Sequence, residues 1–124
     1  MKKLSSIHSV ADFRSLAMAK LPRFAFDFID GGAETELALA RNEQAYRDVL
    51  LMPRIGVNLS MLNTETEVFG KRYAAPFGIA PLGLCGLVHP QADIQLARMA
   101  AHHNIPYIAS ATASTAVEDI ANAT

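Results

Sequence analysis

The stretch PFGIAPLGLCGLVHPQADIQLARMAAHHNIPYIAS, residues 76–110, decides the fold of this chain. Residues 77–80 form a short apolar run between two prolines, which is typical of a buried strand. A helical repeat of apolar side chains follows over residues 91–103, and Asn104 suits the left-handed position after a helix end. Residues 106–110 form a second apolar run. Strand, helix and strand in this order predict two parallel strands joined by a crossover helix.

A further helix is expected after the second strand, because Thr115 and Glu118 have the spacing of a capping box. Two parallel strands cannot bury both faces of a sheet, so more strands are required. A closed barrel of βα units needs roughly 250 residues, whereas this chain has 124 and stops inside an amphipathic helical pattern. We therefore expect a partial domain, the front part of a larger α/β protein.

Helices are expected to dominate the first part of the chain, over residues 9–20, 22–29 and about 33–48. Ser9 is a suitable N-cap for the first helix, and Gly31-Gly32 ends the second. Glu34 and Glu36 are expected at the start of the third helix, where the helix dipole favours acids.

Residues 50–75 separate these helices from the two strands. They contain two β-prone runs, 50–59 and 64–73, and Gly70-Lys71 is expected to supply a hairpin turn. The chain is therefore interpreted as a single partial domain with three parts: a helical lead-in over 1–49, an extended or hairpin segment over 50–75, and two βα units over 76–124.

Composition and charge exclude several classes of function. The 11 basic and 12 acidic residues nearly cancel, so no long-range field favours nucleic acid or a membrane surface. A single cysteine excludes an internal disulfide and fits a reducing compartment. The longest mostly apolar stretch, residues 74–88, is too short and too interrupted to span a bilayer. The chain is expected to be cytoplasmic, without a nucleic-acid partner.

Candidate binding groups lie at the carboxyl ends of the two strands, where function gathers in βα arrays. Pro81, Leu82 and Gly83 follow the first strand, and Ser110 ends the second. Gly83 permits a flat ligand to approach the backbone, and Ser110 offers a hydroxyl group. Such residues are also common in ordinary loops, so spacing alone leaves both interpretations open.

Other reactive residue types form no recognisable site. None of the four histidines has a carboxylate or cysteine partner at ligand spacing, so no metal site is expected. Cys85 has no basic neighbour and is interpreted as a small apolar loop residue. No phosphate-binding glycine motif and no general base stand out. The residue types alone predict half of a ligand site and no reaction.

Two long segments contain further landmarks in a fixed order: LPRFAFDFIDGGAETELALARNEQAYRDVLLMPR and TEVFGKRYAAPFGIAPLGLCGLVHPQADIQLARMAAHHNIPYIASATASTAVEDIA. The landmarks include an aromatic-Asp-x-x-x-Gly-Gly-Ala motif, an Ile-Ala-Pro triplet and a terminal Val-Glu-Asp-Ile-Ala. Together they resemble the FMN-dependent α-hydroxy-acid dehydrogenases and oxidases, which include flavin lactate dehydrogenases, mandelate dehydrogenases and glycolate oxidases. The resemblance extends over nearly the whole chain, from about Val10 onward.

This resemblance implies a (β/α)₈ TIM barrel that binds FMN at the carboxyl ends of its strands. The implied reaction oxidises an (S)-2-hydroxy acid, lactate-like or mandelate-like, to the 2-oxo acid. Pro81, Leu82 and Gly83 match a family segment whose backbone lines the flavin, and Ser110 matches a serine that hydrogen-bonds the isoalloxazine ring. Leu82 replaces the usual Thr or Ser. Phe28 matches a tyrosine that binds the substrate carboxylate, and it lacks that hydroxyl.

The family's catalytic histidine, carboxylate-binding arginines and phosphate-binding loops lie later in the chain, so none is expected in residues 1–124. We expect these residues to be inactive alone and the full-length parent to be a homo-oligomer. The electron acceptor and a peripheral attachment to the inner membrane stay open. One alternative is a non-catalytic remnant that acts at most as an interaction piece. Another is a free-standing ligand-binding module.

Overall fold

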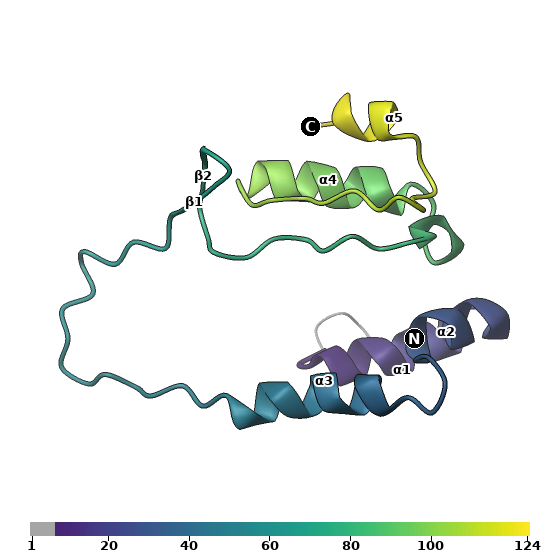
Figure 1. The fold of residues 1–124 in the computed structure, drawn as a ribbon, viewed down its shortest axis with the longest axis horizontal. Helices are drawn as coiled ribbons and strands as arrows, with labels where there is room; N and C mark the ends of the chain where they lie inside the picture. Colours follow the sequence, from purple (N-terminus) through teal and green to yellow (C-terminus); the bar gives the residue numbers. More distant parts are fainter. Residues whose placement is uncertain (1–6) are drawn as a thin grey trace. The chain divides into compact units, whose positions relative to one another are not determined.

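The structure is a computed structural model that describes residues 7–124. The chain forms two compact units, Met1–Val57 and Asn58–Thr124. The regular elements of the first unit are all helices, whereas the second combines a small hairpin with helices (Figure 1). No helix in residues 7–124 is long and apolar enough to cross a membrane.

The first unit contains α1 (Val10–Lys20) and α2 (Arg23–Asp30), both close to their predicted positions. Ser9 caps α1: its Oγ accepts the Asp12 N–H at 3.3 Å, and the Asp12 carboxylate accepts the Ser9 N–H at 3.0 Å. This reciprocal pair is a capping box. Gly31 is the residue that ends α2, as predicted.

The third helix, α3 (Leu37–Asp48), begins about four residues later than predicted. Glu36 precedes it with a left-handed backbone, φ 59°. The Glu36 carboxylate accepts the Gly32 N–H at 3.1 Å. The prediction that both acids lie at the start of the helix is right for Glu36, which is its N-cap, and wrong for Glu34, which lies in the turn before it.

The β-prone run at residues 50–59 forms no strand, so that prediction is also wrong. Its large apolar side chains are exposed, with Leu51 at 93% and Ile55 at 94%. Strand-forming residues become a strand only where a neighbouring strand supplies hydrogen bonds and packing. Within residues 7–124 no strand pairs with this run.

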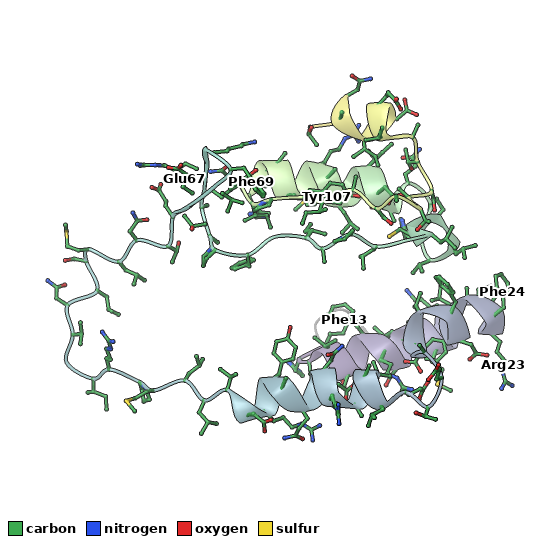
Figure 2. All side chains as sticks on the ribbon, in the orientation of Figure 1. Phe13, Arg23, Phe24, Glu67, Phe69 and Tyr107 are labelled. Atoms are coloured by element: carbon green, nitrogen blue, oxygen red, sulfur yellow. The ribbon has the colours of Figure 1, made fainter. Side chains whose placement is uncertain are left out.

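The second unit starts with the antiparallel hairpin of β1 (Thr66–Val68) and β2 (Lys71–Tyr73). The hairpin prediction is confirmed, but the turn residues are Phe69 and Gly70, not Gly70-Lys71. Both have positive φ, 51° and 76°, as a two-residue turn of type I′ requires. Phe69 is fully exposed at the tip (Figure 2).

A parallel pairing joins the two apolar runs that follow. Ile79 and Tyr107 form a parallel bridge, in which the Ile79 N–H donates to the Pro106 carbonyl at 2.8 Å and the Ile108 N–H donates to the Ile79 carbonyl at 3.1 Å. A Cβ on Gly78 would lie 2.5 Å from the Pro106 carbonyl oxygen, so glycine permits this approach. The predicted parallel pairing is confirmed, although its ladder is a single bridge.

Helix α4 (Ala92–His102) connects the two parallel segments. At its C-terminus the Ile105 N–H donates to the Ala100 carbonyl at 2.9 Å and the Asn104 N–H donates to the Ala101 carbonyl at 3.1 Å. Asn104 has φ 49°. These features make a Schellman motif, which confirms the predicted left-handed Asn104.

The last helix, α5 (Val117–Ala121), is preceded by Ala116 as N-cap, and no side chain caps it. The predicted capping box of Thr115 and Glu118 is therefore wrong. Helix α5 and the short 3₁₀ helix η2 (Cys85–Leu87) both contact α4, and Figure 1 shows α5 beside α4. The core of this unit consists of buried side chains from these three elements: Cys85, Asp93, Ala97, Ala100 and Ile120.

Candidate functional site

The carboxyl ends of the two parallel segments bring two loops together. Residues 81–91 lead from the first segment to α4, and residues 110–116 lead from the second to α5. The Leu84 N–H in the first loop donates to the Thr112 carbonyl in the second at 2.9 Å. The predicted residues after both strands therefore share one edge of the second unit.

Gly83 lies directly against the second loop. A Cβ at this position would lie 2.5 Å from Thr112 Oγ1 and 3.8 Å from Ser110 Oγ. The predicted pair Gly83 and Ser110 is thus brought together. The same contact explains the glycine, because any side chain would collide with Thr112. Thr112 follows the second strand in sequence, but its contact with Gly83 is between two loops and no local pattern predicts it.

Ser110 presents a half-buried hydroxyl group at this edge. Its Oγ accepts the Thr112 N–H at 3.1 Å and lies 3.2 Å from Thr112 Oγ1. A serine hydroxyl has one proton to donate in addition to its two acceptor positions. Ser110 can therefore accept the loop N–H and still donate a hydrogen bond to a ligand heteroatom.

Pro81 and Leu82 are exposed between the first strand and Gly83. The Leu82 carbonyl accepts a hydrogen bond from the Cys85 thiol at 3.4 Å. Because the Leu82 side chain has no polar atom, only its main chain can bond a ligand, as the sequence predicted.

Cys85 is a buried thiol at the start of η2, with 8% of its surface exposed. Burial raises its pKa, and the negative charge of Asp93 raises it further. A thiol held in its protonated form is a poor nucleophile. The interpretation of Cys85 as a small apolar loop residue is consistent with this environment.

Asp93 is a residue that the sequence analysis missed. It lies in the first turn of α4 and is 1% exposed. Its Oδ2 accepts the Ser114 N–H at 3.1 Å, whereas its buried Oδ1 has no partner in residues 7–124. A signal existed: Asp93, Ala97 and Ala100 have helical spacing, which places the acid on the buried face.

The histidines form no ligand cluster in the part of the chain that the structure describes. No group of three or more His, Cys, Asp or Glu side chains there could hold a metal ion. His102 and His103 make an edge-to-face ring contact with centroids 4.9 Å apart at the end of α4.

Phe28 lies on α2, in the other unit from Gly83 and Ser110. Its side chain is 54% exposed, so it is not needed to fill the interior of its own unit. Exposure leaves the ring available to contact a substrate or another part of the protein. Its proposed match to a substrate-binding tyrosine stays a prediction.

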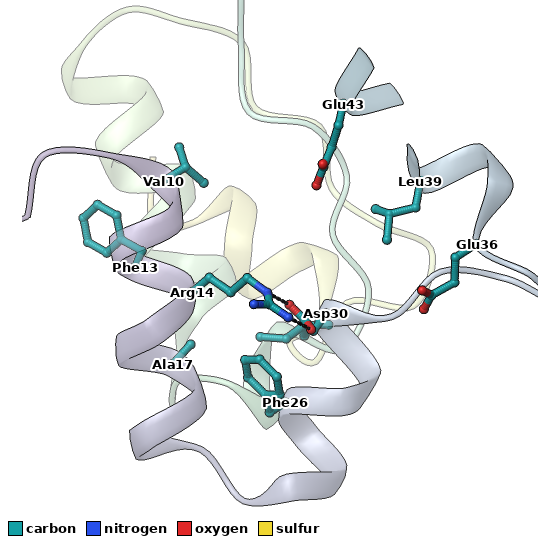
Figure 3. Close-up of a pocket in the computed structure, with 10 residues that line it drawn as sticks. Val10, Phe13, Arg14, Ala17, Phe26, Asp30, Glu36, Leu39 and Glu43 are labelled. Atoms are coloured by element: carbon teal, nitrogen blue, oxygen red, sulfur yellow. Dashed lines mark hydrogen bonds and ion pairs between the residues drawn. The ribbon is translucent and has the colours of Figure 1, made fainter. Parts of the chain in front are cut away.

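A groove of about 640 Å³ lies within the first unit, lined by residues of all three helices (Figure 3). Arg14 crosses it to Asp30, with Nε–Oδ1 at 2.5 Å and Nη2–Oδ2 at 2.7 Å. The hydrogen bond from Arg14 lowers the pKa of the Asp30 carboxyl group. Because the carboxylate of Asp30 is paired with the Arg14 guanidinium and its pKa is lowered, Asp30 is poorly suited to accept a proton as a general base. The groove also has an apolar lining: Val10, Phe13, Ala17, Phe26, Ile29 and Leu39.

Comparison with known proteins gives the family. Residues 17–124 match the sequence model for FMN-dependent dehydrogenases. This chain belongs to the FMN-dependent dehydrogenase family. It is 38% identical over 116 residues to the L-lactate dehydrogenase of Pseudomonas syringae pv. syringae (strain B728a). It is 39% identical over 119 residues to the putative L-lactate dehydrogenase of Mycobacterium tuberculosis (strain ATCC 25618 / H37Rv).

Solved structures of the same kind match closely in three dimensions. The crystal structure of a mandelate oxidase superposes with a TM-score of 0.86 at 35% identity, covering 95% of this chain and 34% of that one. A mandelate oxidase with (S)-4-hydroxymandelic acid gives a TM-score of 0.85 at 36% identity, covering 93% of this chain and 32% of that one. Another similar structure is a mandelate oxidase variant with a C4a-OH-FMN adduct.

These comparisons confirm the predicted family, its enzymatic nature and FMN as its cofactor. The two L-lactate dehydrogenases are matched over 94% and 96% of this chain, which spans 30% and 29% of their length.

Proposed function

We propose that the whole protein that carries this segment oxidises an (S)-2-hydroxy acid to the 2-oxo acid and passes the electrons to FMN. Residues 76–124 would supply the first two βα units of a (β/α)₈ barrel. The observation that carries the proposal is the close approach of Gly83 and Ser110 at the carboxyl ends of two parallel-bonded segments, in a chain of the FMN-dependent dehydrogenase family.

The residues at this edge fit the ring of FMN. Gly83 offers backbone without a side chain, and Ser110 offers a hydroxyl donor for a ring heteroatom. Phosphate groups are usually bound by Lys or Arg side chains or by helix N-termini. The loops 81–91 and 110–116 contain no Lys or Arg. These residues therefore suit the flavin ring, and we place the phosphate on other parts of the whole protein.

Each residue has a limited part in the reaction. FMN, when bound, accepts the electrons that leave the hydroxy acid. The main chain of Pro81, Leu82 and Gly83 would line the flavin, and Ser110 would fix its orientation. Phe28 would contact the substrate near its carboxylate without bonding it. The general base and the arginines that bind the carboxylate would come from the part of the protein outside residues 1–124.

The substrate class follows from the relatives. They are named as L-lactate dehydrogenases and mandelate oxidases, and both names refer to 2-hydroxy acids. We propose the same class for this protein, with a lactate-like or mandelate-like side chain.

The test is expression of the complete gene product, purification and measurement of its visible absorption. We expect a yellow protein whose flavin is bleached without oxygen by L-lactate or (S)-mandelate and not by the opposite enantiomers. Ser110→Ala should weaken FMN retention. A colourless protein that takes up no added FMN would contradict the proposal, and a reading frame that stops at Thr124 would favour the non-catalytic remnant.

A further inference from the structure

Asp93 is a buried carboxylate with an unusual set of contacts. It is 1% exposed, and its Oδ2 accepts the Ser114 N–H at 3.1 Å. Its Oδ1 is buried without a hydrogen-bond partner in residues 7–124. Burying a carboxylate is unfavourable unless other groups compensate its charge. The first-turn position in α4 supplies part of that compensation through the helix dipole. An apolar residue would fill this space without the penalty, so packing alone does not explain the acid.

Ser114 connects Asp93 to the loop after the first strand. Its Oγ accepts the Gly86 N–H at 2.8 Å. A Cβ on Gly86 would come within 2.7 Å of Ser114 Cβ, so the contact requires glycine. Asp93 holds the backbone of Ser114, and the Ser114 side chain holds the backbone of Gly86. The carboxylate therefore ties the loops 81–91 and 110–116 together.

The two tied loops contain the residues proposed to contact the flavin. Leu84, which donates to the Thr112 carbonyl at 2.9 Å, directly follows Gly83. Thr112 in turn donates its N–H to Ser110 Oγ at 3.1 Å. Ser110 also accepts the Ala113 N–H on its carbonyl at 3.1 Å, so the loop turns back on itself just before Ser114. We therefore expect a displacement of Ser114 to shift Ser110.

We propose that Asp93 is a positioning residue for the FMN site, acting through Ser114 to hold Gly83 and Ser110 in the arrangement that binds the flavin ring. The inference rests on the proposed function, because it takes these two residues as flavin contacts. The hydrogen bond that Asp93 accepts comes from Ser114 and not from either of these two residues. Asp93 would affect FMN binding through the position of Ser110, since a hydrogen bond from Ser110 to the flavin weakens steeply as its distance and angle depart from the optimum.

The experiment uses the complete protein with four substitutions. Asp93→Ala removes the acceptor for the Ser114 N–H, and Ser114→Ala removes the acceptor for the Gly86 N–H. Asp93→Asn keeps one carbonyl oxygen that can accept from Ser114, so it tests rescue by a similar shape. Ala100→Gly is the control, because it weakens the same helix at a buried site near the other end.

Two properties are measured well below the unfolding temperature of every variant: the FMN dissociation constant and the visible circular dichroism of the bound flavin. We expect Asp93→Ala and Ser114→Ala each to weaken FMN binding on the order of tenfold, the scale of one lost hydrogen bond, and to change the dichroism. Asp93→Asn should keep both properties. Ala100→Gly should lower the unfolding temperature alone.

The double variant Asp93→Ala, Ser114→Ala tests the connection directly. Because both changes interrupt the same series of contacts from Asp93 through Ser114 to Gly86, we expect it to bind FMN about as weakly as either single variant. Fully additive losses would overturn the inference, as would Asp93→Ala with unchanged FMN binding and dichroism. Should Asp93→Ala fail to fold, unchanged FMN binding in Ser114→Ala would overturn it. A wild-type protein that takes up no FMN would overturn the proposed function itself.

Discussion

Cys85 combines a buried thiol with a nearby carboxylate, and this determines its reactivity. Burial, followed by the charge of Asp93, raises the pKa of the thiol in the folded protein. Because the folded protein favours the protonated thiol, Cys85 contributes to the free energy of unfolding below about pH 8.5, the ordinary thiol pKa. This contribution is lost as the pH rises through the higher folded-state pKa.

We expect Cys85 in the folded complete protein to react with iodoacetamide at pH 8 more slowly than free cysteine. The unfolded protein in urea should react at the rate of free cysteine. Equal rates for the folded and unfolded protein would contradict the prediction.

Phe28 gives the sharpest test of the substrate site at the level of one residue. If this ring faces the substrate carboxylate, Phe28→Tyr adds a hydrogen-bond donor to a charged group. Such a bond contributes roughly 1.5–3 kcal/mol, so we expect kcat/KM for the 2-hydroxy acid to rise about tenfold or more. Phe24→Tyr is the matched control on the same helix, with its side chain 68% exposed (Figure 2). An equal effect of the two substitutions would count against a substrate role for Phe28.

The site was predictable only where residues follow strand ends. Gly83 and Ser110 could be found because parallel strands place their carboxyl ends together, and the structure brings them to one edge. Thr112 and Ser114 act through contacts between loops separated in sequence, which no local pattern reveals. The helical spacing of Asp93 with Ala97 and Ala100 indicates the buried face of the helix, but an isolated acid in a helix is usually interpreted as a solvent-exposed residue.

At the scale of elements, the turn after α4 provides a stability prediction. Asn104 has φ 49° within the Schellman motif, where side chains other than Asn or Gly are strained. We expect Asn104→Ala to lower the free energy of unfolding by about 1 kcal/mol. Asn104→Gly should leave it nearly unchanged, because glycine adopts this conformation without strain. Urea unfolding of the complete protein measures both, and equal destabilisation by Ala and Gly would show that the Asn side chain matters more than its backbone angle.

Elements that depend on local signals were predicted correctly, whereas elements that depend on distant parts of the chain were not. Helix α1 carries its own start signal in Ser9 and Asp12, so its first turn needs nothing from the rest of the chain. The run at residues 50–59 has β-forming side chains but no partner strand in residues 7–124, and it stays irregular. Thr115 has the right spacing for a cap, yet α5 begins after Ala116 without a side-chain cap.

At the scale of the whole molecule, residues 7–124 bury few large apolar side chains. Large side chains such as Leu51, Ile55 and Phe69 are 93%, 94% and 105% exposed. The buried hydrophobic residues in the described part are few and mostly small: Ala25, Phe26, Cys85, Ala97, Ala100 and Ile120. Burying a large apolar side chain stabilises by about 1.5–3 kcal/mol, whereas ordering each backbone residue opposes folding by roughly 1–2 kcal/mol. We expect the balance to be unfavourable without further partners.

We therefore expect the isolated segment 1–124 to lack a cooperative unfolding transition. Its far-ultraviolet circular dichroism should decline gradually on heating, it should bind the hydrophobic dye ANS, and it should retain no FMN. The complete protein is the control and should unfold sharply with its flavin bound. The sequence leads to the same expectation, because a parallel sheet needs strands and helices on both sides before its faces are buried. A sharp, flavin-dependent unfolding transition in residues 1–124 alone would contradict it and would support a free-standing ligand-binding module.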